Sequence, residues 1–339
     1  MQQLSRLLIV ILALALVLPT ASFAQDDPVD LRFTLWIADD HPAIAGVFRP
    51  LADAYTAQNP NVTIEYVFIP NAEYASGLGV QLSGNDAPDA GWMLERDALA
   101  FRDAGVLLDL SDVLVEDAAY NYADFSTSLL GLWTADEAVY GIPFSSSPFI
   151  TIYNAELFEE AGLDTPAELA ARGEWTWEAL AEAARVIREE TGAWGFVGND
   201  GSARLYGPDP WTTLAPLMRA YGGDLLVGNE CTFDSEGSVE AMELLHRMIY
   251  EDRSTVPPGD EVNFWPGEVG ITLGQISRLA NLDEATFEWG IAPLPSGPTG
   301  DVAVVGQAAI VVFDGENNEN QEVAADFVRF LTTEESVTQ

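Results

Sequence analysis

The chain has 339 residues, of which 54 are acidic and 14 are basic, so its formal net charge at pH 7 is −40. A charge of this sign repels phosphate groups, which argues against nucleic acid and anionic lipid as partners. Hydrophobic residues make up 48% of the chain, which excludes a disordered acidic tail, and the single cysteine, Cys231, excludes an internal disulfide.

The first 24 residues are predicted to be an export signal. Arg6 precedes the apolar stretch 7–18, and Ser22-Phe23-Ala24 follows as a small-residue cleavage site. This stretch is too short to span a bilayer, which takes about 20 residues. No cysteine follows it directly, so no lipid anchor is expected there. We therefore expect an exported protein, in the periplasm or at the outer face of the cytoplasmic membrane.

Alternation of apolar and polar residues predicts strands at 31–35 and 62–68, and helical spacing from Ile44 to Tyr55 predicts a helix between them. Pro50 should kink this helix or restart it. A strand, a helix and a strand in this order form the unit of a parallel sheet, so we predict the α/β class. The same alternation continues, with strands expected at 149–153, 289–292 and 302–312 and helices at 177–187, 239–249 and 323–331.

The serines at 145–147 raise the possibility of nucleophilic catalysis. Such chemistry needs a positioned base, and the chain contains only two histidines and no Gly-x-Ser-x-Gly sequence. Two histidines and one cysteine, widely separated, also argue against a zinc or copper site. Gly77 and Gly79 lack the remaining glycine of a dinucleotide fingerprint, so no cofactor is expected. The acidic pairs Asp39-Asp40 and Asp86/Asp89 stay open as a glycosidase pair, because their separation is not given by sequence.

Several segments together carry a resemblance to a known family. Gly141-Ile142-Pro143-Phe144, the stretch 149–154 ending in Tyr-Asn, and the stretch 157–163 reading Leu-Phe-Glu-Glu-Ala-Gly-Leu resemble the signature of the family 1 extracellular solute-binding proteins. These are the maltose-binding-protein-like, sugar-type receptors of ABC importers. Matching segments at 175–178, 221–224, 264–271 and 289–295 extend the resemblance over the mature chain. Family members usually continue beyond the position of Gln339, so we expect a truncated C-terminus.

The resemblance implies a two-lobe periplasmic-binding-protein fold of class II, with lobes that are joined by crossing strands and close on the ligand by a hinge. Residues 25–145 and 273–311 are expected to form the N-lobe, and 146–272 and 312–339 the C-lobe. The crossing strands are expected at 143–152, 271–274 and 310–313.

Sugar recognition requires aromatic faces beside groups that hydrogen-bond to hydroxyls. Trp36 ends the first strand, where ligands gather in open α/β sheets. Asp40 matches the loop position at which sugar-binding relatives present an acid. Trp92 and Arg96 stand where relatives place an aromatic and charged residues. These four are the expected ligand-binding residues of the N-lobe.

Further ligand-binding candidates come from the other segments. Ser147 lies where maltose-binding relatives present an acidic contact, so a hydroxyl would replace a charge. Asp209 and Trp211 resemble an acid-Pro-aromatic triplet that stacks on the ligand. The second crossing strand and the last N-lobe strand supply the remaining candidates: Gln275, Arg278, Gly306 and Gln307.

The resemblance predicts a monomeric substrate-binding protein of an ABC importer, without catalytic activity, which captures a sugar or oligosaccharide and delivers it to a membrane permease. A receptor for a polyamine or another small solute is one alternative. An exported carbohydrate hydrolase is another, and it requires two carboxylates about 5 to 9.5 Å apart across the ligand. The sequence does not choose among the sugars or identify the permease.

Overall fold

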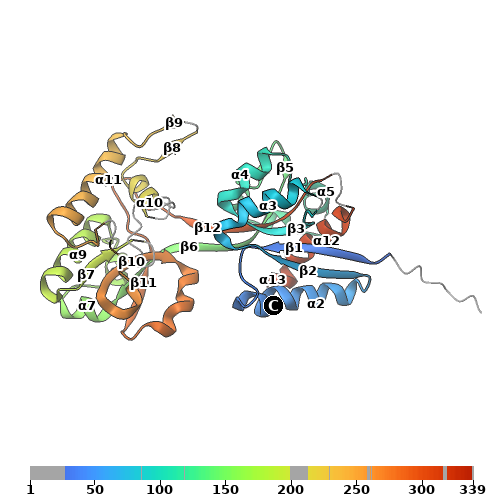
Figure 1. Ribbon diagram of the computed structural model, residues 1–339. Helices are drawn as coiled ribbons and strands as arrows, with labels where there is room; N and C mark the ends of the chain where they lie inside the picture. The colour runs from blue at the N-terminus through green and yellow to red at the C-terminus, as the bar shows by residue number, and fades with distance from the viewer. Residues whose placement is uncertain are drawn as a thin grey trace, which may run out of the picture. The chain divides into compact units, whose positions relative to one another are not determined.

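The computed structural model consists of two units, each with its own core (Figure 1). Unit 1 contains the described residues up to Phe144 and from Ala309 onward, and unit 2 runs from Ser145 to Ala308. None of the helices among the described residues is both long and apolar enough to cross a membrane. The structure describes residues 27–84, 86–117, 119–198, 213–228, 230–257, 260, 262–315 and 319–337.

Unit 1 is built on a sheet in the order β2-β1-β3-β12. Strand β1 (Val29–Leu35) lies parallel to β2 (Val62–Phe68) along its whole length and parallel to β3 (Ala90–Leu94) on its other side. The fourth strand, β12 (Val305–Val312), belongs to this unit from Ala309 onward. The predicted α/β class and the first two predicted strands are confirmed.

Helices cover both faces of this sheet, with α3 and α4 on one face and α2 on the other (Figure 1). Pro50 falls in the first turn of α2, after a separate helical turn, so the predicted restart at Pro50 is confirmed. The helical segments of unit 1 are η1 (Ile44–Phe48), α2 (Arg49–Gln58), η2 (Asn71–Glu73), α3 (Tyr74–Ser83), α4 (Glu95–Asp103), α5 (Ser111–Leu114), η3 (Tyr122–Asp124), α6 (Thr127–Leu130), α12 (Gln321–Leu331) and α13 (Glu334–Val337), and the hairpin β4 (Thr134–Ala135) with β5 (Ala138–Val139) completes the unit.

Unit 2 is built on β6 (Ile142–Asn154), the strand that contains the three serines. From residue 149 on, β6 pairs in antiparallel fashion with β10 (Val269–Gln275) on one side and with β11 (Trp289–Ala292) on the other. Strand β7 (Trp194–Val197) extends this sheet parallel to β10. The predicted strands at 149–153 and 289–292 are therefore confirmed.

Side-chain caps explain where two helices of unit 2 begin. Asn154, the last residue of β6, accepts hydrogen bonds from the backbone N–H groups of Glu156 and Leu157 and so begins α7. Thr176 caps α9 in the same way, as expected for an N-cap threonine. The remaining elements of unit 2 are α7 (Ala155–Glu160), α8 (Pro166–Ala171), α9 (Trp177–Thr191), α10 (Leu214–Ala220), β8 (Leu226–Val227), β9 (Glu230–Cys231), α11 (Glu236–His246), η5 (Arg247–Glu251), η6 (Phe264–Glu268) and η7 (Ile276–Glu284).

The chain passes from unit 1 to unit 2 within β6 and returns within β12. The prediction of a crossing strand at 271–274 is wrong. This segment belongs to β10, which pairs on both sides with strands of unit 2. The same pairing explains why residues 273–308 lie in unit 2 and not in the N-lobe as expected. The C-terminal segment from residue 312 on, expected in the C-lobe, lies in unit 1, because α12 packs against α2, α5 and β3.

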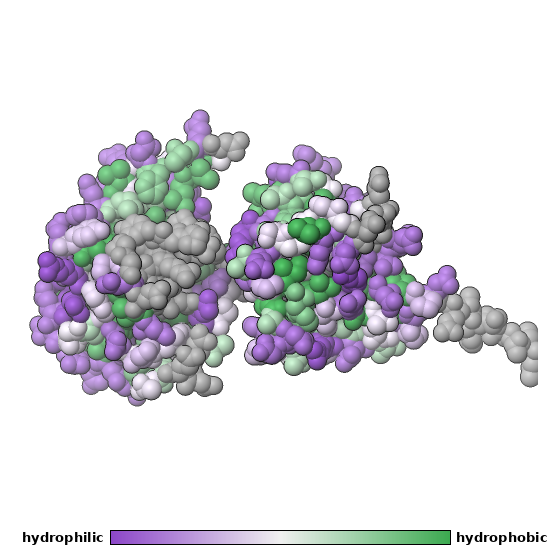
Figure 2. Space-filling view, in the orientation of Figure 1, coloured by the Kyte–Doolittle hydropathy of each residue, from purple (hydrophilic) through white to green (hydrophobic). Residues whose placement is uncertain are grey.

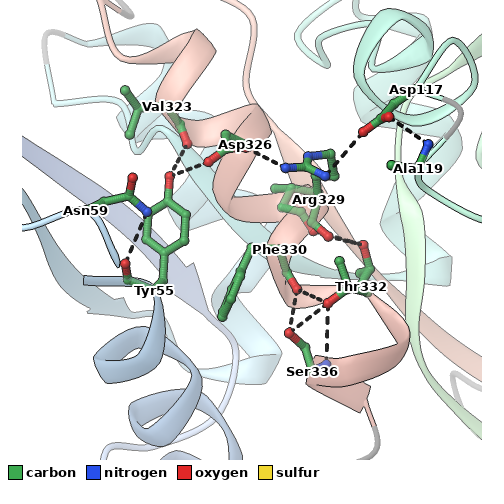
Figure 3. Close-up of polar contacts among 12 residues, drawn as sticks. Tyr55, Asn59, Asp117, Ala119, Val323, Asp326, Arg329, Phe330, Thr332 and Ser336 are labelled. Carbon is green, nitrogen blue, oxygen red and sulfur yellow. Dashed lines mark hydrogen bonds and ion pairs between the residues drawn. The ribbon is translucent and has the colours of Figure 1, made fainter. Parts of the chain in front are cut away.

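A polar network fixes α12 to the rest of unit 1 (Figure 3). Arg329 forms ion pairs with Asp326 on the same helix and with Asp117 in the segment after α5, both at 3.2 Å. The Tyr55 hydroxyl on α2 donates a hydrogen bond to Asp326 Oδ2 at 3.0 Å. Burial and the Asp326 carboxylate both raise the pKa of Tyr55, so this hydroxyl stays protonated and remains a donor. The segment after the return crossing is thereby an integral part of unit 1.

We expect Phe327→Ala to lower the free energy of unfolding of unit 1 by about 3 to 5 kcal/mol, the usual cost of removing a buried phenylalanine. Phe327 on α12 is 1% exposed, and its ring lies 5.7 Å from that of Phe33 and 4.9 Å from that of Tyr55, between centroids. Urea unfolding measures this change. The control is Phe233→Ala, since Phe233 is 41% exposed and should change stability by less than about 0.5 kcal/mol. A loss for Phe327→Ala as small as that of the control would show that α12 does not share the core of unit 1.

Candidate functional site

The three parallel strands of unit 1 end at one edge of the sheet. Their last residues are Leu35, Phe68 and Leu94, and the parallel registers of β1 with β2 and β3 place these ends together. Ligands of open α/β sheets bind at this carboxyl edge. Trp36, Asp40, Trp92 and Arg96 lie at these strand ends or in the segments that follow them. The structure thus brings the four N-lobe candidates to one edge.

Two tryptophans at this edge pack against each other with their rings tilted. The ring centroids of Trp36 and Trp92 are 4.5 Å apart with an interplanar angle of 32°. Phe48 lies 5.1 Å from Trp92, and Phe144 lies 5.5 Å from Phe48. We call Trp36, Phe48, Trp92 and Phe144 the aromatic cluster. Trp92 is 8% exposed and lies inside it, whereas Trp36 and Phe144 are half-buried and present part of their surfaces.

The indole N–H groups of both tryptophans are buried and have no hydrogen-bond partner among the described residues. An unpaired buried donor costs about 1 to 3 kcal/mol. Most buried polar groups in proteins are paired, so unpaired ones call for a specific cause such as a water molecule or a ligand. The aromatic cluster therefore combines the partly exposed ring surfaces of Trp36 and Phe144 with two buried indole N–H groups that have no partner among the described residues.

Asp40 lies in the exposed segment after β1. Its neighbour Asp39 is held by an ion pair with Arg49, with Nη2 and Oδ1 2.6 Å apart. The two aspartates that looked like a possible catalytic pair thus have different surroundings.

Arg96 stands in the first turn of α4 and reaches across to the segment after β2. Its Nη2 donates hydrogen bonds to the backbone oxygen of Asn71 at 2.9 Å and to Asn71 Oδ1 at 2.7 Å. Its Nε lies 3.9 Å from Asp97 Oδ2. Arg96 therefore ties two of the segments that border the carboxyl edge. Sequence reasoning missed Asn71, whose only signal is its place after the second strand.

In unit 2, Ser147 on β6 is joined to Ser277 by two hydrogen bonds. Ser147 Oγ donates to Ser277 Oγ at 3.1 Å and accepts from the Ser277 backbone N–H at 3.2 Å. Gln275, at the end of β10, stands opposite Phe149 in the register and so belongs to the same region. Ser277 was not predicted, although it lies between two candidates in the sequence. The structure therefore brings Ser147, Ser277 and Gln275 together.

The remaining candidates of unit 2 fall in three places. Arg278 is exposed within η7, whereas Gly306 is buried and Gln307 half-buried on β12. Both Arg278 and Gln307 are engaged in further interactions. Asp209 and Trp211 lie outside the described residues.

The second acidic pair lies at the wrong edge of the sheet for a site shared with Trp36. Asp89 precedes β3, at the amino end of that strand, and its Oδ2 accepts a hydrogen bond from the Arg32 backbone N–H at 2.7 Å. Asp86 forms an ion pair with the Arg32 side chain at 2.9 Å. Burial raises the pKa of Asp89, and hydrogen bonds from Arg32 and Asn320 lower it in part. These contacts give the pair a structural role.

A surface depression of about 580 Å³ lies on unit 2, around α9 and α11. Glu178, Glu240 and Glu243 line it, and Arg247 forms an ion pair with Glu178 at 2.7 Å. Hydrophilic residues cover much of the described surface of this unit visible in Figure 2. Within the described ranges, no three or more His, Cys, Asp or Glu residues gather as a metal site would require. The depression contains none of the predicted site residues.

The comparisons with known proteins agree on one family. A family model described as "Bacterial extracellular solute-binding protein" matches residues 38–338. The sn-glycerol-3-phosphate-binding periplasmic protein of Shigella dysenteriae is 26% identical over 315 residues, which cover 85% of this chain and 68% of that protein.

Solved structures share the fold of this chain. An ABC substrate-binding protein of Listeria monocytogenes, in complex with cycloalternan, has a TM-score of 0.75 at 22% identity and covers 92% of this chain and 77% of its own. A Mycobacterium tuberculosis protein in complex with glycerophosphocholine also has a TM-score of 0.75 at 22% identity, over 90% and 75% of the two chains. These likenesses confirm the predicted two-lobe periplasmic-binding-protein fold.

We expect Asp97→Asn to become more stabilising as the pH rises from about 4 to 7. Burial raises the pKa of the Asp97 carboxyl, and Arg96 lowers it in part. A carboxyl whose pKa is higher in the folded than in the unfolded protein releases its proton more readily on unfolding. Its contribution to the free energy of unfolding therefore falls as pH rises through the unfolded and then the folded pKa. The measurement is the difference in free energy of unfolding between variant and wild type at each pH.

The control for this experiment is Asp109→Asn, for which the opposite trend is expected. Burial raises the pKa of Asp109, but hydrogen bonds from the Ser111 side chain, the Ser111 backbone and the Val139 backbone outweigh it, and the pKa is lowered. The stability that this carboxylate provides is present at neutral pH and is lost in acid. If both variants followed the same trend, the buried environment of Asp97 would not be responsible.

Proposed function

Because the chain belongs to the bacterial extracellular solute-binding protein family, we propose that it is the substrate-binding protein of an ABC importer. It captures a sugar or oligosaccharide outside the cytoplasmic membrane and delivers it to the membrane permease. The observation that carries this proposal is the aromatic cluster at the carboxyl edge of the unit 1 sheet, where the half-buried Trp36 lies with Asp40 and Arg96. An aromatic face beside polar groups is the arrangement that pyranose rings require.

The choice of a sugar rests on the polar groups around this cluster. Arg96 and Arg49 are already engaged by Asn71 and Asp39, and the chain has a net charge of −40, so an anionic solute finds little attraction. A neutral polyol can instead use the hydroxyl, amide and carboxylate groups of the candidate residues and the exposed part of the Trp36 ring. The proposed ligand-binding residues are Trp36, Asp40, Trp92, Arg96, Ser147, Asp209, Trp211, Gln275, Arg278, Gly306 and Gln307.

Candidates occur in both units, and the chain crosses between the units only within β6 and β12. We propose that the solute favours the closed state of a hinge motion, by no more than the difference between its affinities for the closed and open states. The protein is exported by the signal at residues 1–24, acts as a monomer and catalyses no reaction. The structural role of Asp86 and Asp89 supports a receptor over a hydrolase, since it removes one candidate pair of catalytic acids.

A panel of mono-, di- and oligosaccharides with the purified protein tests the proposal. A bound sugar should raise the melting temperature in a saturable way and change tryptophan fluorescence, because binding to the folded state alone adds about 2.7 kcal/mol at a hundredfold excess over Kd. Chromatography of the mixture should recover the sugar unchanged. Hydrolysis products would contradict the receptor assignment. If none of the sugars bound and a polyamine tested alongside them did, the ligand would be a cationic solute and not a sugar.

We expect Trp36→Leu to weaken sugar binding by about 1 to 3 kcal/mol, the range that substitution gives for aromatic stacking on nucleic-acid bases. Isothermal titration calorimetry with the sugar found in the panel measures this loss. The matched control is Trp289→Leu, since Trp289 is 38% exposed on β11 and has no place among the candidates. An affinity that is unchanged in the first variant would remove Trp36 from the site.

A further inference from the structure

The contact between Arg96 and Asn71 joins the ends of two strands that are not neighbours in the sheet. Arg96 stands shortly after the end of β3 and Asn71 shortly after the end of β2, and β1 lies between these two strands. The hydrogen bonds from Arg96 to Asn71 therefore span the end of β1, at Leu35. Trp36, which supplies the exposed aromatic surface of the proposed site, follows Leu35 directly.

A backbone contact holds the segment of Asn71 beside this same strand end. The backbone N–H of Ile69 donates to the backbone oxygen of Leu35 at 2.9 Å, so the chain after β2 stays attached to the last residue of β1. Asn71 follows Ile69 closely and begins the short helix η2, where it is exposed. Its polar groups are therefore accessible to a solute at the carboxyl edge of the sheet.

Arg96 determines which polar group of Asn71 faces a solute. Nη2 of Arg96 donates to the backbone oxygen of Asn71 at 2.9 Å and to its Oδ1 at 2.7 Å. The side-chain amide carries an acceptor oxygen on one side and an NH2 donor on the other. Because Oδ1 points at the guanidinium, Nδ2 and its two protons point away from it. Nδ2 donates to no residue in the part of the chain that the structure describes, so Asn71 presents a donor of fixed direction.

We propose that Asn71 is a further ligand-binding residue, which donates a hydrogen bond from Nδ2 to an oxygen of the solute. This inference rests on the proposed function. A sugar hydroxyl can accept such a bond, whereas a protonated amine has only protons to donate. Asn71, held by Arg96, therefore favours a sugar over a polyamine beside the Trp36 ring.

Calorimetric titration of Asn71→Ala with the sugar identified in the panel tests the proposal. We expect its Kd to rise about 2- to 10-fold, the loss of one hydrogen bond. The matched control is Asn61→Ala, because Asn61 precedes β2 at the opposite edge of the sheet, where its Nδ2 donates to the backbone oxygen of Asp27 at 3.3 Å. Equal affinities of the two variants would contradict the proposal. A wild type that binds none of the sugars would instead overturn the proposed function itself, so the two failures are distinguishable.

Deoxy analogues of the same sugar separate a contact with the solute from a structural effect. Wild type and Asn71→Ala should bind equally well to the one analogue that lacks the hydroxyl held by Asn71, and should differ for the other analogues. A loss in Asn71→Ala that is the same for every analogue would mark an effect on the fold alone and would overturn the proposal.

Asn71→Asp tests the direction of the hydrogen bond, and it decides the question if Asn71→Ala does not fold, because it keeps an oxygen for Arg96. Fluorine in place of the same hydroxyl can accept a hydrogen bond but cannot donate one. This replacement should cost Asn71→Asp more affinity than it costs the wild type, since an ionised carboxylate has no proton to donate. The control is Asn61→Asp, which carries the same added charge. An equal cost in wild type and Asn71→Asp would rule out a donor at residue 71.

Discussion

The parallel pairing of β1 with both of its neighbours is the constraint on which the candidate site of unit 1 depends. Because β1 lies between β2 and β3 in parallel register, the segments after all three strands meet at one edge. Trp36, Asn71 and Arg96 come from different parts of the chain and reach this edge only through that pairing. A shift of the register by one residue would turn Leu31, Phe33 and Leu35, which are all 0% exposed, away from their core. The hydrophobic pattern that fixes the sheet therefore also fixes the site.

The sequence predicted the elements well because their signals are local. Alternation marks β1 and β2, Pro50 marks the start of α2, and Thr176 marks the start of α9. Asn154 adds a physical meaning to the Tyr-Asn end of the signature, because its side chain caps the helix that follows. Such features depend on neighbours a few residues apart, which sequence shows directly.

The assignment of elements to units could not be predicted in the same way. The strand β10 resembles a crossing strand in sequence, yet its partners are β6 and β7, both far from it along the chain. The helix α12 gives an amphipathic pattern that fits either unit. Its packing on α2, α5 and β3 and its contacts with Tyr55 and Asp117 place it in unit 1, and none of these partners is near it in the sequence. Pairings over a long sequence separation leave no trace in local periodicity.

In the candidate site, too, the sequence predicted which residues take part, but only the packing shows how far each side chain is exposed. Trp36 and Trp92 were both predicted, but packing makes them unequal, since Trp92 is enclosed by Trp36 and Phe48. Phe144 lies inside the signature, and its ring contact with Phe48 gives that part of the signature a packing role.

The excess of acidic residues affects the stability of the whole fold more than it affects the candidate site. Several arginines each form ion pairs with two nearby carboxylates. Arg185 contacts Glu182 and Glu189, and Arg172 contacts Asp164 and Glu174. With 54 acidic residues and 14 basic ones, such pairs leave most carboxylates without a cation. Exposed ion pairs contribute about 0 to 1 kcal/mol each, so they do not compensate for the repulsion of the remaining charges. Packing of the two cores and the strand pairing of β1 must therefore offset the repulsion between like charges. A high net charge of this kind favours solubility and not stability.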